Sequence, residues 1–487
     1  MRLLQLIKPI HSFRCARAIA DFHVRGLCCN SRSVRPGYVF VAVKGAAQDG
    51  RRFIGEAVAR GARAVISAPG SSLGSGVRDV SLIEVSDTRR VLSLLANEFN
   101  RRPSTRMKVT GVTGTNGKTT ITYLIETIIR KAGFSPAVIG TVNYRYGGKA
   151  FPSCNTTPGP VELHGLLGRM VRAGATHAVM EVSSHALDQN RTRDVAFSSA
   201  IFTNLTQDHL DYHKDFAGYF AAKARLFTGL SPTAAAIVNE DDRYGRRLKK
   251  MTRARLITYG ISRPCDVRAQ KIKMDVRGCS FLLNAFGKKT RITTSLIGRH
   301  NVYNLLAACA WAVSEGIPLK TVREAIRGFS LVPGRLEKVE CAEGFSVFVD
   351  YAHTEDALRN VITSLRQVSR GRIIVVFGCG GDRDRTKRPR MGRVVSRLAD
   401  LCVVTSDNPR SEDPLAIIRE VTGGIRGKRH LVVADRKEAI GKALSAAKRG
   451  DIVLIAGKGH ENYQIIGGLT LPFDDRSVVK ECLRYKR

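Results

Sequence analysis

The sequence predicts an α/β protein of three domains, and three observations lead to this prediction. The chain has 487 residues, which is too long for one ordinary hydrophobic core. Short apolar strand patterns alternate with helical patterns along it, as in parallel sheets with crossover helices. The alternation breaks at two loops, residues 101–104 and 331–335. We therefore expect a small N-terminal α/β domain at 1–102, a central domain at 103–331 and a C-terminal α/β domain at 332–487.

The composition indicates a folded, soluble protein with an excess of positive charge. Hydrophobic residues make up 43% of the chain, but no apolar run is long enough to cross a bilayer, so we expect no membrane partner. The 79 Lys and Arg residues against 42 Asp and Glu residues give a formal net charge of +37, which favours anionic partners. The basic residues are scattered, without zinc-finger spacing or the aromatic residues of RNA-binding motifs. We expect acidic small-molecule substrates and no specific nucleic acid, with a general basic bias on solvated surfaces as the simplest cause of the charge.

The cysteines and the first 20 residues indicate in which cellular compartment the protein is expected. Eleven cysteines are scattered without a Cys-x-x-Cys pair, which indicates reduced thiols. The first 20 residues are rich in arginine and free of acidic residues, as in an organellar transit peptide. Leu3, Leu4 and Ile7 are instead spaced as one face of a helix, which favours the start of a domain. We expect a cytoplasmic monomer.

In the first domain, apolar runs predict short strands and a helix. Residues 38–43 (YVFVAV) and 64–66 (AVI) are typical of strands. Residues 53–60 form a helical pattern that Gly61 ends, and residues 69–76 form a loop rich in Gly and Ser.

The other two domains repeat an alternation of strands and helices. In the central domain a strand at 107–112 leads through a glycine-rich loop to a helix at 121–132, and strands follow at 178–180 and 199–202. This order predicts a parallel, mononucleotide-binding sheet. The third domain is expected to be Rossmann-like, with strands at 346–349, 372–377, 401–404, 430–433 and 452–455.

The loop GTNGKTT at 114–120 predicts a nucleotide site. Backbone N–H groups of such a loop and of the following helix point at phosphate oxygens. Lys118 would neutralise the β and γ phosphates, and the Thr119 hydroxyl would bind Mg²⁺. Val112 stands where the strict Walker pattern has its first glycine. The predicted ATP-binding residues of the loop are Gly114, Thr115, Asn116, Gly117, Lys118, Thr119 and Thr120.

A second cluster contains carboxylates and histidines. Glu181 ends a predicted strand, which places it at the carboxyl edge of the sheet, where α/β sites lie. The segment 203–213 holds His209 and His213 in a His-x-Asp-x-His pattern. That pattern alone is similar to a zinc hydrolase ligand set, or to a polar loop with capping residues. A nucleotide enzyme, however, also needs a carboxylate beside its phosphate loop for Mg²⁺.

Four motifs together resemble the central domain of Mur ligases, the enzymes that build the peptide of bacterial cell-wall precursors. They are GTNGKTT at 114–120, EVSSHAL at 181–187, FTNLTQDHLDYH at 202–213 and YFAAKARLF at 219–227. The resemblance implies ATP as substrate, Mg²⁺, and a carbamate formed from CO₂ on Lys223. It also implies that Lys118, Glu181, His209 and Lys223 are catalytic, and that Thr119, Glu181, His209 and carbamylated Lys223 bind metal.

The resemblance extends through most of the chain. GRHNVYN at 298–304, PGR at 333–335 and DYAH at 350–353 are similar to family segments near ATP, and imply that Asn301, Arg335 and Asp350 bind it. Glu355 stands where the family often has proline.

The N-terminal region resembles the UDP-binding region of the tripeptide-forming members, although Asn30 replaces the usual aspartate. Hydroxyl, amide and guanidinium groups suit the carboxylates and sugar oxygens of a muramoyl-dipeptide. The resemblance implies that this substrate contacts Cys29, Ser31, Ala46, Ala47, Gln48, Asn155, Thr156, Thr157, Ser183, Gln189 and Arg191.

In the third domain, GGDR at 380–383, DNPR at 407–410 and AGKGHE at 456–461 resemble the motifs of members that add meso-diaminopimelate. The distal carboxylate of meso-diaminopimelate, which lysine lacks, suits a bidentate pair with an arginine such as Arg410. The implied diaminopimelate-binding residues are Arg383, Asp407, Asn408, Pro409, Arg410, Gly457 and Glu461.

The implied reaction is ATP-dependent addition of meso-diaminopimelate to the D-Glu of UDP-N-acetylmuramoyl-L-alanyl-D-glutamate through an acyl phosphate. Two alternatives stay open at this point. The first is a ligase that adds L-lysine or another diamine, or a folylpolyglutamate-like relative. The second is a non-catalytic nucleotide-binding protein.

Overall fold

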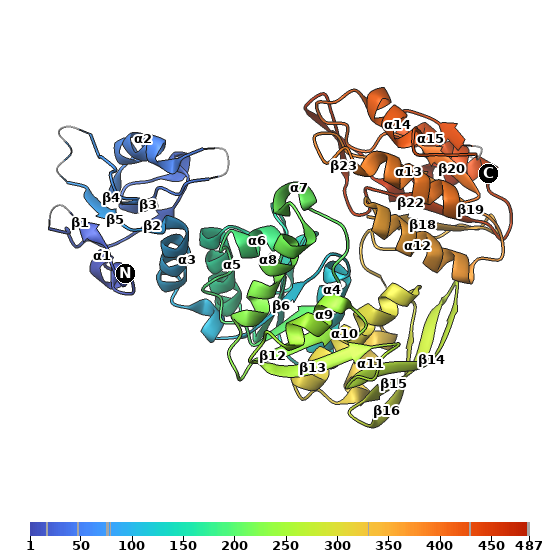
Figure 1. Cartoon of the computed structure of the whole chain (residues 1–487), viewed down its shortest axis with the longest axis horizontal. Helices are drawn as coiled ribbons and strands as arrows, with labels where there is room; N and C mark the ends of the chain where they lie inside the picture. The colour runs from blue at the N-terminus through green and yellow to red at the C-terminus, as the bar shows by residue number, and fades with distance from the viewer. Residues whose placement is uncertain are drawn as a thin grey trace.

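The computed structural model describes residues 1–15, 18–45, 48–74, 77, 79–329, 331–427 and 430–484. Three sheets with their helices form three domains along the chain, and the central domain lies between the other two (Figure 1). In the described part of the chain, no helix combines the length and the apolar character needed to cross a membrane.

The first domain is a five-stranded sheet with flanking helices. Its elements are α1 (Leu3–Ile7), β1 (Arg14–Cys15), β2 (Gly26–Cys28), η1 (Ser31–Ser33), β3 (Tyr38–Val41), η2 (Gly50–Phe53), α2 (Ile54–Ala59), β4 (Ala62–Ser67), β5 (Ser81–Glu84) and α3 (Thr88–Phe99). The strand order is β1-β5-β4-β3-β2, and β1 alone of these strands runs antiparallel to its neighbour. The Asp87 side chain caps α3 by accepting a hydrogen bond from Arg90 N–H. One face of α3 packs in the first domain and the helix contacts α5 (Pro160–Arg172) of the central domain.

The central domain contains an eleven-stranded sheet. Its other elements are η3 (Pro103–Thr105), β6 (Lys108–Thr113), α4 (Lys118–Lys131), β7 (Pro136–Ile139), β8 (Asn143–Tyr146), β9 (Lys149–Pro152), β10 (His177–Glu181), α6 (Ser184–Asp188), β11 (Ser199–Phe202), α7 (Leu210–His213), α8 (Phe216–Thr228), β12 (Ala235–Asn239), α9 (Arg243–Lys249), β13 (Arg255–Gly260), β14 (Val267–Asp275), β15 (Gly278–Ala285), β16 (Lys288–Thr294), α10 (Arg299–Ser314) and α11 (Leu319–Arg327). The order is β16-β15-β14-β13-β12-β11-β6-β10-β7-β8-β9. One apolar core lies under α4, α10 and α11, and a second lies on the other face under α5 and α8.

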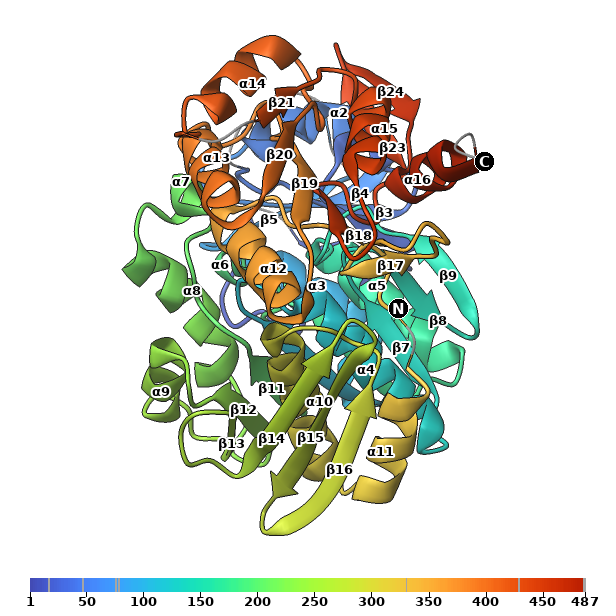
Figure 2. The same cartoon turned by 90° about the vertical axis from the view of Figure 1, so that its right-hand side faces the viewer.

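The antiparallel parts of this sheet depart from the parallel sheet predicted from the sequence. The strands from β14 to β7 are parallel, but β15, β16, β8 and β9 pair antiparallel. Figure 2 shows β14, β15 and β16 as a long extension of the sheet. Their side chains alternate between the core and solvent, so they lack the continuous apolar runs of the buried parallel strands.

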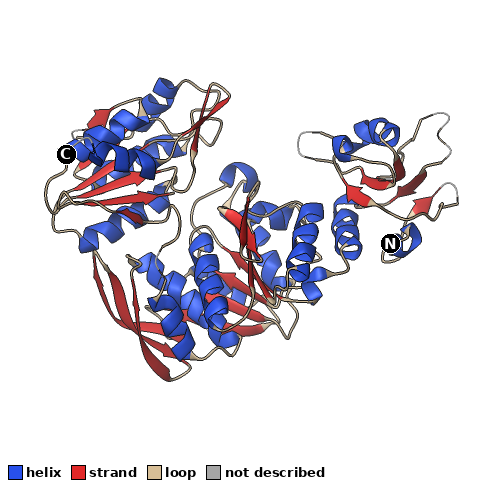
Figure 3. Cartoon of the chain, turned by 180° about the vertical axis from the view of Figure 1, so that it is seen from behind, coloured by secondary structure: helices blue, strands red, loops and turns tan. Residues whose placement is uncertain are grey.

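The third domain is built on an α/β sheet that is parallel except for β17, which pairs antiparallel with β18. Its elements are β17 (Glu337–Val339), β18 (Ser346–Asp350), α12 (Glu355–Val368), β19 (Ile373–Phe377), α13 (Lys387–Leu398), β20 (Leu401–Val404), α14 (Pro414–Thr422), β21 (His430–Val432), α15 (Arg436–Ala446), β22 (Ile452–Ala456), β23 (Tyr463–Ile466), β24 (Leu469–Pro472) and α16 (Asp475–Arg484). The main sheet has the order β17-β18-β22-β19-β20-β21, and β23 and β24 form a hairpin. Helices cover both faces of this sheet (Figure 3).

Candidate active site

The site begins at the carboxyl ends of three adjacent strands, β11, β6 and β10. The phosphate loop follows β6, Glu181 ends β10, and Thr203 follows β11. The strands that follow β6 and β10 in the chain lie on both sides of this pair: β7 lies beside β10, and β11 lies beside β6. The direction in which the chain extends the sheet therefore reverses here. Open α/β sheets bind ligands outside such a reversal point.

The phosphate loop requires glycine at two positions. Gly114 has a φ of +144°, and a Cβ there would lie 1.8 Å from Thr203 Oγ1. Gly117 has a φ of +92°, and a Cβ there would lie 2.4 Å from Asn304 Oδ1. Both positions combine a left-handed backbone with a close neighbour, so a side chain would displace the loop.

Residues after β11 hold the phosphate loop in place. Asn204 Oδ1 accepts a hydrogen bond of 3.0 Å from Asn116 N–H, and the Asn204 carbonyl accepts one of 2.9 Å from Thr115 N–H. Thr203 Oγ1 donates to the Asn116 carbonyl at 2.7 Å. The loop conformation is therefore set by the neighbouring strand end as well as by its own glycines.

Two lysines meet at the carbonyl oxygen of Gly114. Lys118 Nζ donates to it at 2.9 Å, and Lys223 Nζ donates to it at 3.0 Å. Lys223 lies on α8, is 1% exposed, and its Nζ is 4.5 Å from the ring centroid of Tyr219. Burial and the nearby charge of Lys118 lower the pKa of Lys223 well below its usual range. This environment favours the neutral amine, which is the form of lysine that reacts with CO₂.

The carboxylate of Glu181 touches the hydroxyl expected to bind Mg²⁺. It is buried and accepts hydrogen bonds from Thr119 Oγ1 at 3.1 Å, Thr141 N–H at 2.9 Å and Thr141 Oγ1 at 3.0 Å. Arg335, which precedes β17, donates to Thr119 Oγ1 at 3.3 Å. The structure thus brings Thr119, Glu181 and Arg335 together from three distant segments.

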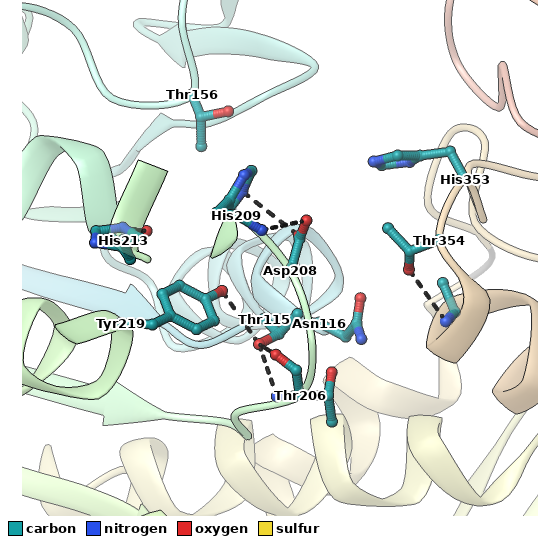
Figure 4. Close-up of polar contacts among 12 residues, drawn as sticks. Thr115, Asn116, Thr156, Thr206, Asp208, His209, His213, Tyr219, His353 and Thr354 are labelled. Carbon is teal, nitrogen blue, oxygen red and sulfur yellow. Dashed lines mark hydrogen bonds and ion pairs between the residues drawn. The ribbon is translucent and has the colours of Figure 1, made fainter. Parts of the chain in front are cut away.

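His209 lies on the loop after β11, with a left-handed φ of +54°. Its Nε2 is 3.5 Å from Asp208 Oδ2, and its ring centroid is 4.8 Å from that of His185. Partial burial lowers the pKa of His209, which favours the neutral imidazole that binds metals. Figure 4 shows the ring of His353, from the third domain, pointing toward the side on which Asp208 and His209 lie.

The donor set fits a magnesium ion better than a hydrolytic zinc ion. Hydroxyl and carboxylate oxygens such as those of Thr119 and Glu181 are ligands that Mg²⁺ prefers. Within the described residues, no group of three or more His, Cys, Asp or Glu side chains is placed to hold a metal. The His-x-Asp-x-His pattern does not converge, because His213 Nε2 instead lies 2.9 Å from Ser184 Oγ. A carbamate on the buried lysine would add oxygen ligands to those of Glu181.

A cavity of about 1010 Å³ lies between the central and third domains. Tyr351 and His353 line it from the third domain, opposite Asp208 of the central domain. The residues of the predicted sites that line it are Asn155, Thr156, His209, Arg383, Asp407, Asn408, Arg410, Gly457 and Glu461.

A second cavity of about 480 Å³ borders the phosphate loop. The predicted ATP-binding residues that line it are Asn116, Gly117, Thr119, Thr120, Asn301, Arg335 and Asp350. The other three, Gly114, Thr115 and Lys118, belong to the same loop. Burial raises the pKa of Asp350, whose carboxylate accepts hydrogen bonds from Leu336 N–H and Ala352 N–H.

Four of the predicted dipeptide-binding residues form one hydrogen-bonded chain. Thr157 Oγ1 donates to the Glu181 carbonyl at 2.9 Å and accepts from Ser183 N–H at 3.0 Å. Arg191 Nη1 donates to the Thr157 carbonyl at 2.9 Å, and its Nη2 donates to Gln189 Oε1 at 2.7 Å. This chain connects the predicted substrate contacts to the strand that carries Glu181.

The predicted amine site lies at the carboxyl ends of β20 and β22. Asn408 is buried, and its Nδ2 donates to Glu461 Oε2 at 2.9 Å. Its Oδ1 accepts a hydrogen bond of 3.0 Å from the buried Lys458 Nζ. Arg410 Nη1 donates to a loop carbonyl at 2.7 Å, and Arg383 Nη1 donates to another at 2.9 Å. Pro409 does not line the cavity but lies between Asn408 and Arg410 in this loop.

The predicted UDP-binding residues lie apart from both cavities, in the first domain. The described members are Cys29, Ser31 and Gln48. Ser31 Oγ donates to Glu56 Oε2 at 2.7 Å. Ala46 and Ala47 lie outside the described residues.

Comparison with known proteins places the chain in a family. Three family models match it in succession: "Mur ligase family, catalytic domain" at 23–100, "Mur ligase middle domain" at 112–312 and "Mur ligase, glutamate ligase domain" at 334–459. A relative from Solibacter usitatus, a UDP-N-acetylmuramoyl-L-alanyl-D-glutamate–2,6-diaminopimelate ligase, is 46% identical over 473 residues, which cover 96% of this chain and 95% of the relative. The chain belongs to the Mur ligase family.

Other relatives of this Mur ligase are similar over nearly their whole length. A protein of the same name from Aquifex aeolicus is 46% identical over 462 residues, which cover 94% of each chain. A solved structure of a UDP-N-acetylmuramoyl-L-alanyl-D-glutamate–2,6-diaminopimelate ligase is 34% identical, covers 95% of each chain and superposes with a TM-score of 0.69. The predicted three-domain α/β architecture is therefore confirmed as the Mur ligase fold.

Several residues of this Mur ligase site were missed by the sequence analysis. Thr141 binds Glu181 but follows an unremarkable strand, so no local pattern marks it. Asn204 and Asn304 lie inside recognised motifs, where their amides could have been singled out. Asp356 lines both cavities but sits in an ordinary helical first turn.

Proposed function

We propose that this chain is an ATP-dependent ligase that adds meso-diaminopimelate to the D-Glu of UDP-N-acetylmuramoyl-L-alanyl-D-glutamate, a step in the synthesis of peptidoglycan precursors. One observation carries the proposal. A single cavity is lined by His209 beside the phosphate loop and by Asn408, Arg410 and Glu461 from the third domain. An acyl group activated at the loop and an incoming amine would meet in this cavity. The relatives named above support the same activity.

ATP would bind with its phosphates on the loop 114–120 and its nucleoside in the smaller cavity. Lys118 Nζ, which now donates to two loop carbonyls, would turn to the β and γ phosphates. Asn301, Arg335 and Asp350 would line the nucleoside end. The γ-carboxylate of D-Glu would attack the γ-phosphorus, with ADP leaving, and the amine would then attack the acyl carbon of the acyl phosphate, with phosphate leaving.

Thr119, Glu181, His209 and carbamylated Lys223 would hold Mg²⁺. The metal would supply positive charge to the phosphate oxygens when bound. The neutral Lys223 amine would add to CO₂, forming an N–C bond and releasing a proton, so that a buried neutral amine becomes an anion. The lowered pKa of Lys223 supports this modification, as does the nearby ammonium group of Lys118, which donates to the same Gly114 carbonyl and could pair with the anion.

The muramoyl-dipeptide would extend from the first domain to the phosphate loop. Cys29, Ser31, Ala46, Ala47 and Gln48 would bind its uridine end. Its peptide end would contact Asn155, Thr156, Thr157, Ser183, Gln189 and Arg191. Because the Thr157 hydroxyl donates to the Glu181 carbonyl, a carboxylate bound there would lie near the metal ligands.

Diaminopimelate would bind in the third domain. The acidic and amide side chains of Asp407, Asn408 and Glu461 suit its ammonium groups, and Arg410 suits its distal carboxylate through a bidentate pair. Arg383, Pro409 and Gly457 complete the proposed contacts. We expect the enzyme to act as a cytoplasmic monomer, with domains at 1–102, 103–331 and 332–487.

The first experiment is phosphate release from ATP with the UDP-muramoyl-dipeptide present, comparing meso-diaminopimelate, L-lysine and no amino acid. We expect strong stimulation by diaminopimelate alone, which disappears when Mg²⁺ is removed with EDTA. Stimulation by lysine instead would keep the reaction and refute the amine specificity. No turnover with either amine would refute the ligase and favour a nucleotide-binding protein.

A further inference from the structure

Arg388 lies on the first turn of α13. Its side chain is fully buried and does not line the large cavity. A buried guanidinium is costly unless its N–H groups are paired. Arg388 therefore needs partners, and the identity of those partners indicates what it does.

Arg388 binds the loop that carries Arg410. Its Nη1 and Nη2 donate to the two oxygens of Glu412 at 2.9 and 2.7 Å, a bidentate pair. Its Nη1 also donates to Glu420 Oε2 at 3.0 Å, and its Nη2 lies 3.5 Å from the Gly380 carbonyl. One buried side chain thus contacts both loops of the predicted amine site, the one at 380–383 and the one at 407–412.

Glu412 also binds the loop at 380–383. Its Oε1 also accepts a hydrogen bond of 2.6 Å from Asp382 N–H, the residue before Arg383. The two loops then bind each other directly: Gly381 N–H donates to the Asn408 carbonyl at 2.9 Å, and Arg410 Nη1 donates to the Gly381 carbonyl at 2.7 Å. Behind both loops, the fully buried Arg388 thus forms charged pairs with two carboxylates, those of Glu412 and Glu420.

The two loops hold strained backbone at Arg410 and at Asp382, the residue before Arg383. Asp382 has a φ of +52° and Arg410 has a φ of +55°, although neither is glycine. A left-handed residue other than glycine costs about 1–2 kcal/mol, so surrounding contacts must hold it. Gly381 cannot be replaced without displacement, because a Cβ there would lie 1.9 Å from the Pro409 carbonyl.

We propose that Arg388 is a positioning residue for the amine substrate: through Glu412 it holds the two loops in the one arrangement in which Arg383 and Arg410 both face the cavity. Arg388 touches no substrate and takes part in no chemical step. It sets how selectively the site recognises an amino acid with a second carboxylate. This inference rests on the proposed function, because it assigns a determinant of the amine specificity.

The test compares Arg388→Lys and Glu412→Gln with the wild-type enzyme. Lysine keeps the charge but loses the planar fork, and glutamine keeps the shape but loses the charge. We measure kcat and KM for meso-diaminopimelate, KM for ATP and for the UDP-muramoyl-dipeptide, and the ratio of kcat/KM for diaminopimelate over L-lysine. The control is Arg372→Lys, because Arg372 also pairs with a carboxylate of the same domain, donating from Nε and Nη2 to Asp451 Oδ2, away from these loops.

For either variant we expect KM for diaminopimelate to rise about tenfold or more and the selectivity ratio to fall similarly, as when one charged hydrogen bond is lost. KM for ATP and for the muramoyl-dipeptide should change less than about twofold, since those sites share no contact with Arg388. The double variant should be little worse than either single one, because both act through the same pair. The Arg372→Lys enzyme should keep the wild-type selectivity.

Three results would overturn the inference. One is an unchanged KM and selectivity in folded Arg388→Lys and Glu412→Gln enzymes. Another is an equal rise in KM for all three substrates together with a lower unfolding temperature, which would make Arg388 only a structural residue. The third is failure of both variants to fold, which would have the same meaning. A wild-type enzyme that is not stimulated by diaminopimelate would instead refute the proposed function itself.

Discussion

The carboxylate of Asp356, near the start of α12, accepts a hydrogen bond of 3.0 Å from Asn116 Nδ2 of the phosphate loop. The same oxygen accepts one of 2.9 Å from Thr206 Oγ1. One carboxylate of the third domain therefore joins two loops of the central domain, and Asp356 lines both the smaller and the larger cavity.

We expect Asp356→Ala to loosen the docking of the third domain. A hydrogen bond to a charged group contributes about 1.5–3 kcal/mol, so loss of two should reduce the docked population at least tenfold. Small-angle scattering of the ligand-free enzyme should show a larger radius of gyration, and amides of α12 should exchange faster. Glu355→Ala is the control, because Glu355 pairs with Arg359 on its own helix. Identical scattering and exchange in wild type and Asp356→Ala would contradict this role.

Replacing Lys223 by arginine should abolish the dependence of activity on CO₂. Arginine is of similar length but cannot form the carbamate, so we expect kcat to fall about 100-fold or more, as when one group that stabilises the transition state is removed. Added bicarbonate should stimulate the wild-type enzyme after CO₂ depletion and leave the variant unchanged. ¹³C NMR with labelled bicarbonate should show a carbamate signal in the wild type and in an exposed control, Lys250→Arg. A wild type without this signal would refute the modification.

Arg410→Lys should weaken diaminopimelate binding without disturbing ATP. Lysine cannot make a bidentate pair with the distal carboxylate, and loss of one charged hydrogen bond predicts a rise in KM of about 10–100-fold. Steady-state kinetics with each substrate varied in turn would measure this. The result would be contradicted by an unchanged KM for diaminopimelate, or by an equal rise in KM for ATP.

The pair of Glu412 with Arg388 should give a defined pH dependence of stability. Hydrogen bonds from Arg388 and from Asp382 N–H lower the pKa of Glu412 from 4.5 to about 2. Because the folded pKa is lower than the unfolded one, the stabilisation is complete above pH 4.5 and is lost as the pH falls toward 2. The gap in unfolding temperature between the wild type and Glu412→Gln should therefore be constant from neutral pH to about pH 5 and shrink below that. A gap that stays the same at about pH 3 would refute the assigned pKa.

Much of the fold could be predicted because its signals are local. The strands at 199–202 and 401–404 have the predicted bounds, and the other predicted strands differ by few residues. The strands β14, β15 and β16, which pair antiparallel with one another, were not predicted, because about half of their side chains face solvent and they lack a continuous apolar run. Lys223 would have been one surface lysine among many without its resemblance to a family motif.

The sequence by itself determined the phosphate loop, the order of the domains and the motifs of the family. These depend on backbone conformation and on residues close together in the chain, such as the left-handed Gly117 followed by Lys118. Only the tertiary structure decided that Lys118 and Lys223 share one carbonyl oxygen, that Thr141 binds Glu181, and that Arg388 lies behind both amine-site loops. Such contacts join segments far apart in sequence, and they exist because the packing of sheets and helices brings the strand ends together, which no local pattern encodes.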